Sequence, residues 1–238
     1  MRELLLTFAL TACGSATARL EMSNQTPMAR SSVLADGTSL RLKILAVYLA
    51  QDVDPMTMNN IGSTEMIWLN PECNGDISGC NVDGFDMPVG PRVTQYFDLA
   101  RPSAEVTAEL ESEDLPIDPG SYRYARIELC KAYDQTTRPS VPTMMWAGPG
   151  MTDEQPFTSG DCGRTSLAFD PPLAIAAGDA VTVDLGYDLG KAIVSGTPDP
   201  VSAYMLAGSD HFYRACDDTS DASRVCMDFP FAPTATKL

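Results

Sequence analysis

The chain has 238 residues, of which 44% are hydrophobic, and this length and content suit one large packed β domain or two small ones. Its formal net charge is −16, from 32 acidic and 16 basic residues. An acidic balance of this size argues against nucleic acid and anionic lipid headgroups as partners, and it permits calcium binding.

A short apolar run at the N-terminus ends at a cysteine. Residues 4–9 are mostly apolar, and they lead into the tetrapeptide Leu10-Thr11-Ala12-Cys13. This tetrapeptide resembles the lipobox of bacterial lipoproteins, in which an aliphatic residue and two small residues precede the cysteine that receives the lipid. The resemblance implies that residues 1–12 are a signal peptide and that Cys13 becomes a lipidated N-terminus. Because Gly14 follows Cys13, the sorting rule of such lipoproteins favours the outer membrane over the inner membrane.

The apolar run is too short to span a bilayer, which favours the apolar region of a signal peptide. A signal over residues 1–12 would be shorter than the usual length of roughly 15–30 residues. The alternative interpretation is a buried N-terminal strand in which Cys13 is an ordinary core cysteine. Residues 13–39 are rich in Ser, Thr, Asn, Gln and Ala, and we predict that they form a flexible tether between lipid and domain.

The sequence between residues 40 and 230 predicts an all-β domain, because proline and glycine are spread through it and few segments keep a helical period. The clearest strand is 180–188, where apolar and polar residues alternate as a half-buried strand requires. A short helix is predicted over 103–110, because a proline followed by a capping serine, here Pro102 and Ser103, is typical of a helix start. The alternation of apolar and polar residues in this segment also permits a strand. The other predicted strands cover residues 40–48, 64–69, 92–99, 122–130, 165–169, 201–206 and 225–229.

About eight short strands joined by turns predict one antiparallel β-sandwich with room for one short helix. Residues 231–238 are predicted to be a loose C-terminal tail. The turn and strand segments Ile117-Asp118-Pro119-Gly120 and Val181-Thr182-Val183-Asp184 resemble those of uncharacterised bacterial lipoproteins with immunoglobulin-like or carbohydrate-module-like sandwiches. The resemblance covers residues 40–195, and it implies a surface domain without naming a ligand.

The chain contains seven cysteines, an odd number that a lipidated Cys13 explains. Export to an oxidising compartment favours disulfides among the other six cysteines. A metal site is the competing interpretation, but the sequence has no Cys-x-x-Cys motif and His211 is its only histidine. We predict the three pairs that each bracket one loop, which are Cys73–Cys80, Cys130–Cys162 and Cys216–Cys226.

No motif in the sequence indicates catalysis. His211 directly follows Ser209 and Asp210, whereas the members of a catalytic triad meet through the fold rather than along the chain. The chain has neither a Gly-x-Ser-x-Gly elbow nor a glycine-rich phosphate loop. An acidic chain offers many carboxylate pairs, and their spacing selects none as a glycosidase pair. The sequence therefore predicts a protein that is not an enzyme, with an envelope hydrolase as the last alternative.

Calcium is the one cofactor that the sequence permits. Asp52 and Asp54 lie on one side of an extended segment, and Asn59 and Asn60 follow them. Oxygen ligands clustered in one loop are what Ca²⁺ requires. The four residues match no EF-hand pattern, and a solvated acidic loop is the alternative interpretation.

Three aromatic residues are candidates for a sugar-binding surface. Tyr122 and Tyr124 share one face of the predicted strand 122–130, and Trp146 lies in a segment rich in proline and glycine that we interpret as a loop. Exposed aromatic rings offer flat apolar faces on which sugar rings can stack. The alternative is that these rings fill the sandwich or cover its end.

Taken together, these observations predict a lipid-anchored protein of the bacterial cell envelope with a non-catalytic role in binding, adhesion or structural support. A calcium-stabilised carbohydrate-binding module is the alternative. The expected partners are the membrane, through the N-terminal lipid, and a glycan or another envelope protein, whereas nucleic acid is not expected.

Overall fold

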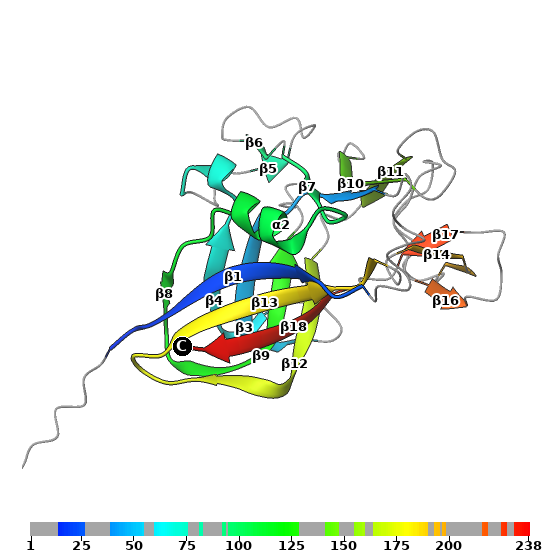
Figure 1. Ribbon diagram of the computed structural model, residues 1–238. Coiled ribbons are helices and arrows are strands. Elements are labelled where there is room, and N and C mark those ends of the chain that lie inside the picture. Colours follow the sequence, from blue (N-terminus) through cyan, green and yellow to red (C-terminus); the bar gives the residue numbers. More distant parts are fainter. Residues whose placement is uncertain are drawn as a thin grey trace, which may run out of the picture.

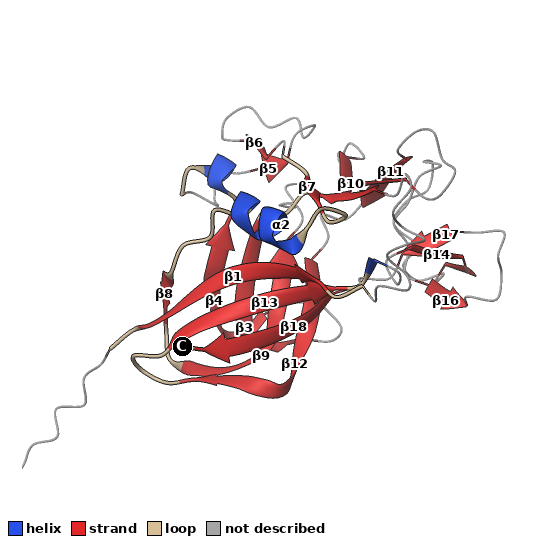
Figure 2. Ribbon diagram, in the orientation of Figure 1, coloured by secondary structure: helices blue, strands red, loops and turns tan. Residues whose placement is uncertain are grey.

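A computed structural model of the chain describes residues 14–26, 39–54, 60–75, 81–82, 92–93, 95–128, 141–147, 155–159, 164–189, 193–195, 197–198, 216–218, 225–227 and 231–238. Strands make up most of this part of the chain, and the helix α2 (Ser103–Glu109) and the 3-10 turn η1 (Pro71–Cys73) lie beside them (Figure 2). The predicted all-β class with one short helix is therefore confirmed.

Two four-stranded sheets enclose the core (Figure 1). The sheet that we call the front sheet has the order β18 (Phe231–Lys237), β13 (Ala180–Tyr187), β1 (Ala16–Asn24) and β8 (Leu115–Ile117). The back sheet has the order β12 (Arg164–Ile175), β9 (Gly120–Glu128), β3 (Ala46–Val53) and β4 (Asn60–Leu69). The sheets approach each other at both margins, where β12 lies beside β18 and β4 lies beside β8. Buried side chains from both sheets form one cluster that includes Leu20, Leu49, Ile67, Ile127, Val183 and Leu185.

A third sheet and three small strand pairs lie outside this sandwich (Figure 1). The third sheet has the order β11 (Gln155–Ser159), β10 (Val141–Ala147), β2 (Ser39–Leu42) and β7 (Phe97–Asp98). The pairs are β14 (Ile193–Ser195) with β17 (Val225–Met227), β15 (Thr197–Pro198) with β16 (Cys216–Asp218), and β5 (Asn81–Val82) with β6 (Arg92–Val93).

The strand β1 lies in the interior of the front sheet, which corrects the predicted tether of residues 13–39 over residues 16–24, while residues 13 and 27–38 lie outside the described residues. It pairs in parallel with β13 from Thr17 opposite Ala180 to Asn24 opposite Tyr187. Its side chains alternate between core and surface, and the inward set is Ala16, Ala18, Leu20 and Met22, none more than 1% exposed. The prediction was wrong because this alternation lies in a segment of small and polar residues. The parallel pairing also departs from a purely antiparallel sandwich.

The helix α2 covers the part of β1 that lies beyond the short strand β8. The backbone amides of Leu20, Met22 and Asn24 donate to side-chain hydroxyls rather than to a neighbouring strand. Thr107 Oγ1 accepts from the Met22 amide at 3.2 Å and donates to the Met22 carbonyl at 2.9 Å. The predicted helix is thus confirmed, but its first residue is not the cap, because Ser103 Oγ accepts from Asn24 and Pro102 precedes the helix without a side-chain bond.

The strand β18 corrects the predicted C-terminal tail at 231–238. It pairs antiparallel with β13 from Phe231 opposite Tyr187 to Lys237 opposite Val181. The ring of Phe231 is 8% exposed and packs edge-to-face on Tyr187 with 5.9 Å between ring centroids. Pro233 suits this place, because β18 is an edge strand and proline has no amide to donate.

The predicted strand 40–48 is two strands in two different sheets. The strand β2 ends at Leu42 and β3 begins at Ala46, and the three residues between them are buried. Asn70 satisfies the carbonyls of Ile44 and Leu45 at this crossover, each at 2.9 Å. Four other predicted strands overlap observed ones: 64–69, 122–130, 165–169 and 180–188 overlap β4, β9, β12 and β13, respectively. The predicted strand 225–229 overlaps β17, and within the described residues of 92–99 the only strands are the short β6 and β7. The predicted strand 201–206 lies outside the described residues.

Candidate binding groove between the two sheets

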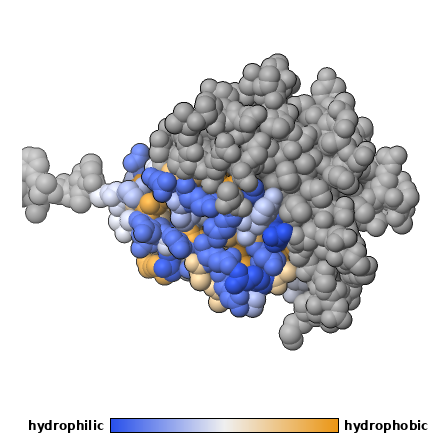
Figure 3. Space-filling model, turned by 90° about the horizontal axis from the view of Figure 1, so that it is seen from above, coloured by the Kyte–Doolittle hydropathy of each residue, from blue (hydrophilic) through white to orange (hydrophobic). Residues whose placement is uncertain are grey.

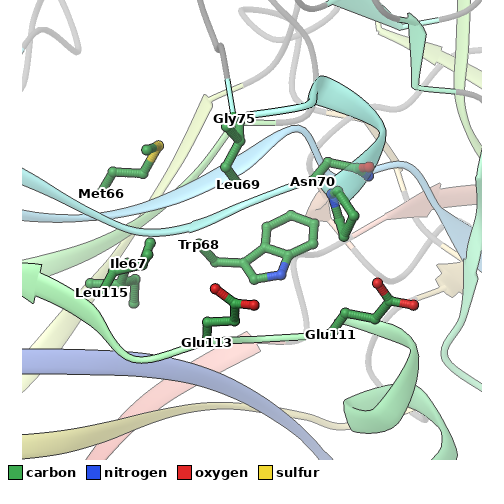
Figure 4. A pocket seen from close by; sticks show the side chains of 10 residues that line it. Met66, Ile67, Trp68, Leu69, Asn70, Gly75, Glu111, Glu113 and Leu115 are labelled. Atoms are coloured by element: carbon green, nitrogen blue, oxygen red, sulfur yellow. The ribbon is translucent and has the colours of Figure 1, made fainter.

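A groove follows the margin where β4 of the back sheet lies beside β8 of the front sheet. Among the described residues, β4 pairs only with β3, and β8 pairs only with β1. The space between these two edges is a cavity of about 360 Å³, close to the lower limit of ordinary ligand sites (Figure 4). We call it the seam groove, and its lining residues are Met66, Ile67, Trp68, Leu69, Asn70, Pro71, Gly75, Glu111, Glu113 and Leu115.

The seam groove runs along the edge of β4 rather than over its face. Its lining includes four consecutive residues of β4, Met66 to Leu69. Successive side chains of a strand point to opposite faces of the sheet, so a cavity on one face would contact only alternate residues. Contact with all four therefore places the backbone edge of β4 beside the groove.

Trp68 joins the two sides of the margin beneath the groove. Its indole Nε1 donates to the carbonyl of Leu110 at 2.7 Å, and its ring packs edge-to-face on Phe97 with 5.8 Å between centroids. The side chain is 2% exposed, and Figure 4 shows the indole between β4 and the segment that carries Glu113. An anchored aromatic ring gives the groove a fixed apolar floor.

Glu111 holds a backbone conformation that side chains other than glycine rarely adopt. It follows the end of α2 with φ of 47°, in the left-handed region. Helices commonly end in this conformation with glycine, because a Cβ there is unfavourable by roughly 1 kcal/mol. The chain thus places a carboxylate at a position where glycine would be more stable.

The seam groove combines an apolar floor with an acidic rim. Glu111 and Glu113 line it, both are exposed, and the lining residues that the structure describes include no Lys or Arg. The next residue, Asp114, is also exposed but does not line the groove. Figure 4 shows both lining carboxylates on the side of the groove opposite β4. This arrangement suits a ligand that is cationic and partly apolar.

A second concave site of about 550 Å³ lies on the outer face of the front sheet, beside α2. Its lining is rich in hydroxyl groups and includes Arg19, whose Nε donates to Thr182 Oγ1 at 3.1 Å. Asp184 Oδ2 accepts from Ser23 Oγ at 2.5 Å, while Asp184 Oδ1 is buried and has no hydrogen-bond partner in the part of the chain that the structure describes. Burial raises the pKa of Asp184, and the Ser23 hydroxyl opposes this shift.

The predicted calcium residues are only partly brought together. Asn60 pairs with Val53 across the β3–β4 hairpin, whereas Asn59 lies outside the described residues. Asp52 already has protein partners, because Oδ1 accepts from the Val53 amide and Oδ2 lies 3.5 Å from Arg123 Nη1. Within the described ranges, no three His, Cys, Asp or Glu side chains are placed to hold a metal ion. Calcium binding at Asp52, Asp54, Asn59 and Asn60 therefore stays a prediction.

The predicted aromatic surface is wrong for Tyr122. This side chain is fully buried in the core, and its hydroxyl donates to the Asp118 carbonyl at 2.6 Å. Tyr122 belongs to the same buried cluster as Ala125, and the pairing of β9 with β12 shifts register between Tyr124 and Tyr122. Tyr124 is half-buried beside Arg123. Trp146 belongs to β10 rather than a loop, and its side chain lies outside the described part.

The disulfide predictions are tested at one cysteine. Cys73 is fully buried in η1 and is disulfide-bonded. Its pairing with Cys80 stays a prediction, because Cys80 lies outside the described residues. The same holds for the predicted lipidation of Cys13 and for the predicted pair Cys130–Cys162. For Cys216–Cys226 only the backbones are described, in β16 and β17.

Trp68, Glu111 and Glu113 of the seam groove were not among the predicted site residues. A signal for the last two was present, because the acidic run 111–114 follows the predicted helix directly. No helix in the described part of the chain is long and apolar enough to cross a membrane. Neither a family model, nor a curated protein, nor a solved structure matches this chain.

Proposed function

We propose that the chain is a lipid-anchored protein of the bacterial cell envelope with a non-catalytic binding role, and that the seam groove is its binding site. The observation that carries the binding role is the combination of a fixed indole floor, two exposed carboxylates and an open strand edge in one cavity. The anchor rests on the lipobox-like residues 10–13 and on the odd number of cysteines.

The chemistry of the lining supports binding rather than catalysis. The described lining of the seam groove contains no His, Cys, Lys, Arg or Tyr, so it does not offer a nucleophile with an activating base. Its two carboxylates, Glu111 and Glu113, come from one short segment. A glycosidase instead needs two carboxylates that flank the bond to be cleaved.

Lipid attachment at Cys13 would determine where this binding takes place. Each buried methylene group contributes roughly 0.8 kcal/mol to membrane binding, and a single acyl chain holds a protein only marginally. Processed bacterial lipoproteins, which residues 10–13 resemble, carry two or three chains on the cysteine. Such an anchor would keep the seam groove at the membrane surface.

The anchor is tested by mass spectrometry of the N-terminus of protein purified from membranes of its native host or of a bacterial host that processes lipoproteins. We expect residues 1–12 to be absent and the mass of Cys13 to be increased by acyl chains. The variant Cys13→Ser should lose this mass and leave the membrane fraction. An intact segment 1–12 with a free Cys13 thiol, or with Cys13 in a disulfide, would refute the anchor.

The binding role is tested by photo-crosslinking in living cells. We expect p-benzoylphenylalanine in place of Glu113 to form discrete adducts with an envelope component. The matched control carries the same residue in place of Ala232, which is exposed on β18 and distant in sequence from the groove. Adducts that form equally at both positions, or at neither, would contradict a binding role for the seam groove.

A further inference from the structure

We infer that the ligand of the seam groove is an extended, basic segment of a partner protein, which adds as a further strand to the free edge of β4. This inference rests on the proposed function and names the partner class for the same site. Three observations support it: the unpaired edge of β4 beside the groove, the distribution of prolines among the edge strands, and the negative charge of the rim.

Of the four edge strands of the two main sheets, β4 alone lacks a proline. The strand β8 contains Pro116, β18 contains Pro233, and β12 contains Pro171 and Pro172. Proline blocks strand pairing, because it has no amide hydrogen, and it is a common means of protecting sheet edges against association. The ten residues of β4 also contain no Lys, and their only charge is Glu65. The unprotected edge is therefore the one beside the cavity.

Within the described ranges, the unpaired edge of β4 continues beyond the seam groove. The first four residues of β4, Asn60 to Ser63, are exposed, and burial increases toward Ile67 and Trp68. An unpaired edge offers amide and carbonyl groups that bind an extended peptide regardless of its side chains, while neighbouring pockets select alternate side chains. An added strand over Met66 to Leu69 would place its side chains against the floor and rim of the groove.

The charge of the rim selects a basic segment. Glu111 and Glu113 line the groove, no compensating cation is present among its described lining residues, and the whole chain has a net charge of −16. A partner with Lys or Arg at alternate positions would be attracted, and an acidic segment would be repelled. The left-handed conformation of Glu111 is consistent with retention of its carboxylate for binding rather than for stability.

The test uses the full chain with Trp146→Phe, so that Trp68 is the only tryptophan. The probe is a peptide of alternating lysine and valine, about ten residues long to match a long strand. We expect it to change the fluorescence of Trp68 and to slow hydrogen exchange in residues 66–69. The same peptide with alternate backbone amides methylated should bind at least tenfold more weakly, because it loses two or more hydrogen bonds to β4. A peptide with glutamate in place of lysine should not bind.

The matched variants concern the rim. We expect Glu111→Gln combined with Glu113→Gln to weaken binding roughly three- to tenfold at low salt, and less at high salt. Asp114→Asn removes the same charge one residue outside the lining, and it should leave binding within about twofold. Glu111→Gly should weaken binding while it raises the resistance of the fold to urea, which separates lost binding from lost folding.

The outcomes separate this inference from the proposed function. If the methylated peptide binds as well as the parent peptide and both require Glu111 and Glu113, strand addition is refuted and the seam groove is still a binding site. If no peptide affects Trp68, the inference fails, and crosslinks at the Glu113 position then decide the proposed function independently. Binding that is equal in Asp114→Asn and in the double glutamine variant would place the peptide elsewhere and also refute the inference.

Discussion

Two core tyrosines differ in whether their hydroxyl groups have partners. Burial raises the pKa of both, that of Tyr122 to about 12. Tyr122 donates to the Asp118 carbonyl, whereas the buried Tyr187 hydroxyl has no hydrogen-bond partner within the described ranges. We predict that Tyr122→Phe lowers the free energy of unfolding by about 1 kcal/mol and that Tyr187→Phe leaves it unchanged or raises it. Urea unfolding of the two variants tests this, and an equal loss in both would contradict it.

Asp184 makes a pH-dependent contribution to stability. Burial is the largest cause that raises its folded-state pKa. The hydrogen bond from the Ser23 hydroxyl lowers the pKa, and the negative charge of Glu21 raises it further. A carboxyl with a raised folded pKa contributes stability below its unfolded pKa, near 4, and loses it as pH rises through the folded value. We predict that Asp184→Asn is more stable than the parent at pH 7, by about 1 kcal/mol, and that the difference disappears toward pH 3.

Chemical unfolding across this pH range measures the effect of Asp184→Asn. The control is Glu21→Gln, on the same face of the front sheet, where the side chain is 39% exposed and pairs with Arg19. Its effect should stay within about 0.5 kcal/mol at any pH. A stability gain in Asp184→Asn that persists at pH 3 would assign the effect to packing rather than to charge.

At the scale of elements, α2 supplies hydrogen bonds to the backbone of β1 that a neighbouring strand would otherwise supply. Thr107 satisfies both backbone groups of Met22, and Thr107→Val keeps the shape of the side chain while it removes both hydrogen bonds. We predict a loss of about 1–3 kcal/mol, because a buried amide and a buried carbonyl are left unsatisfied. Hydrogen exchange of the Met22 amide should accelerate. The control is Thr236→Val, because Thr236 is exposed in β18, and it should change the free energy of unfolding by less than about 0.5 kcal/mol. Equal effects of the two variants would show that α2 does not support β1.

The elements also show what local sequence patterns can and cannot predict. The strand β13 was predictable, because its apolar and polar residues alternate without interruption. Ala16, Ala18, Leu20 and Met22 of β1 alternate in the same way, but their neighbours suggested a tether. The parallel pairing of β1 with β13 joins segments about 160 residues apart, so it could not be predicted from any local sequence pattern. The predicted helix was correct in place, while its contact with β1 depends on this distant pairing.

The seam groove could not be predicted for a related reason. Its floor and rim meet only through the fold, as the bond between Trp68 and Leu110 across 42 positions illustrates. The acidic run after α2 was visible in the sequence, but its place beside the free edge of β4 was not. The described part of the upper face is mostly hydrophilic with scattered apolar spots, in keeping with the acidic composition (Figure 3). Composition thus predicts the character of the surface, and topology decides where a ligand can bind.

At the scale of the whole molecule, β1 determines which end of the sandwich would face a membrane. β1 begins at Ala16, so a lipid on Cys13 would lie within about 10 Å of the fold. The Thr17 amide bonds to Asp179, which places the turn with Ala177 at this end (Figure 1). The nine residues of β1 extend about 26 Å to Asn24, where α2 begins. The exposed residue Ala104 of α2 lies at that distal end.

We therefore predict that the lipidated protein holds a fixed orientation on liposomes. A spin label on Ala177→Cys should be relaxed strongly by nickel chelated to lipid headgroups, and a label on Ala104→Cys should be relaxed weakly. A flexible Gly/Ser spacer of about 20 residues after Ser15 would extend the anchor by about 25 Å, similar to the length of β1, and it should remove the difference between the labels. Equal relaxation of both labels without the spacer would mean that the short connection to Cys13 does not orient the domain.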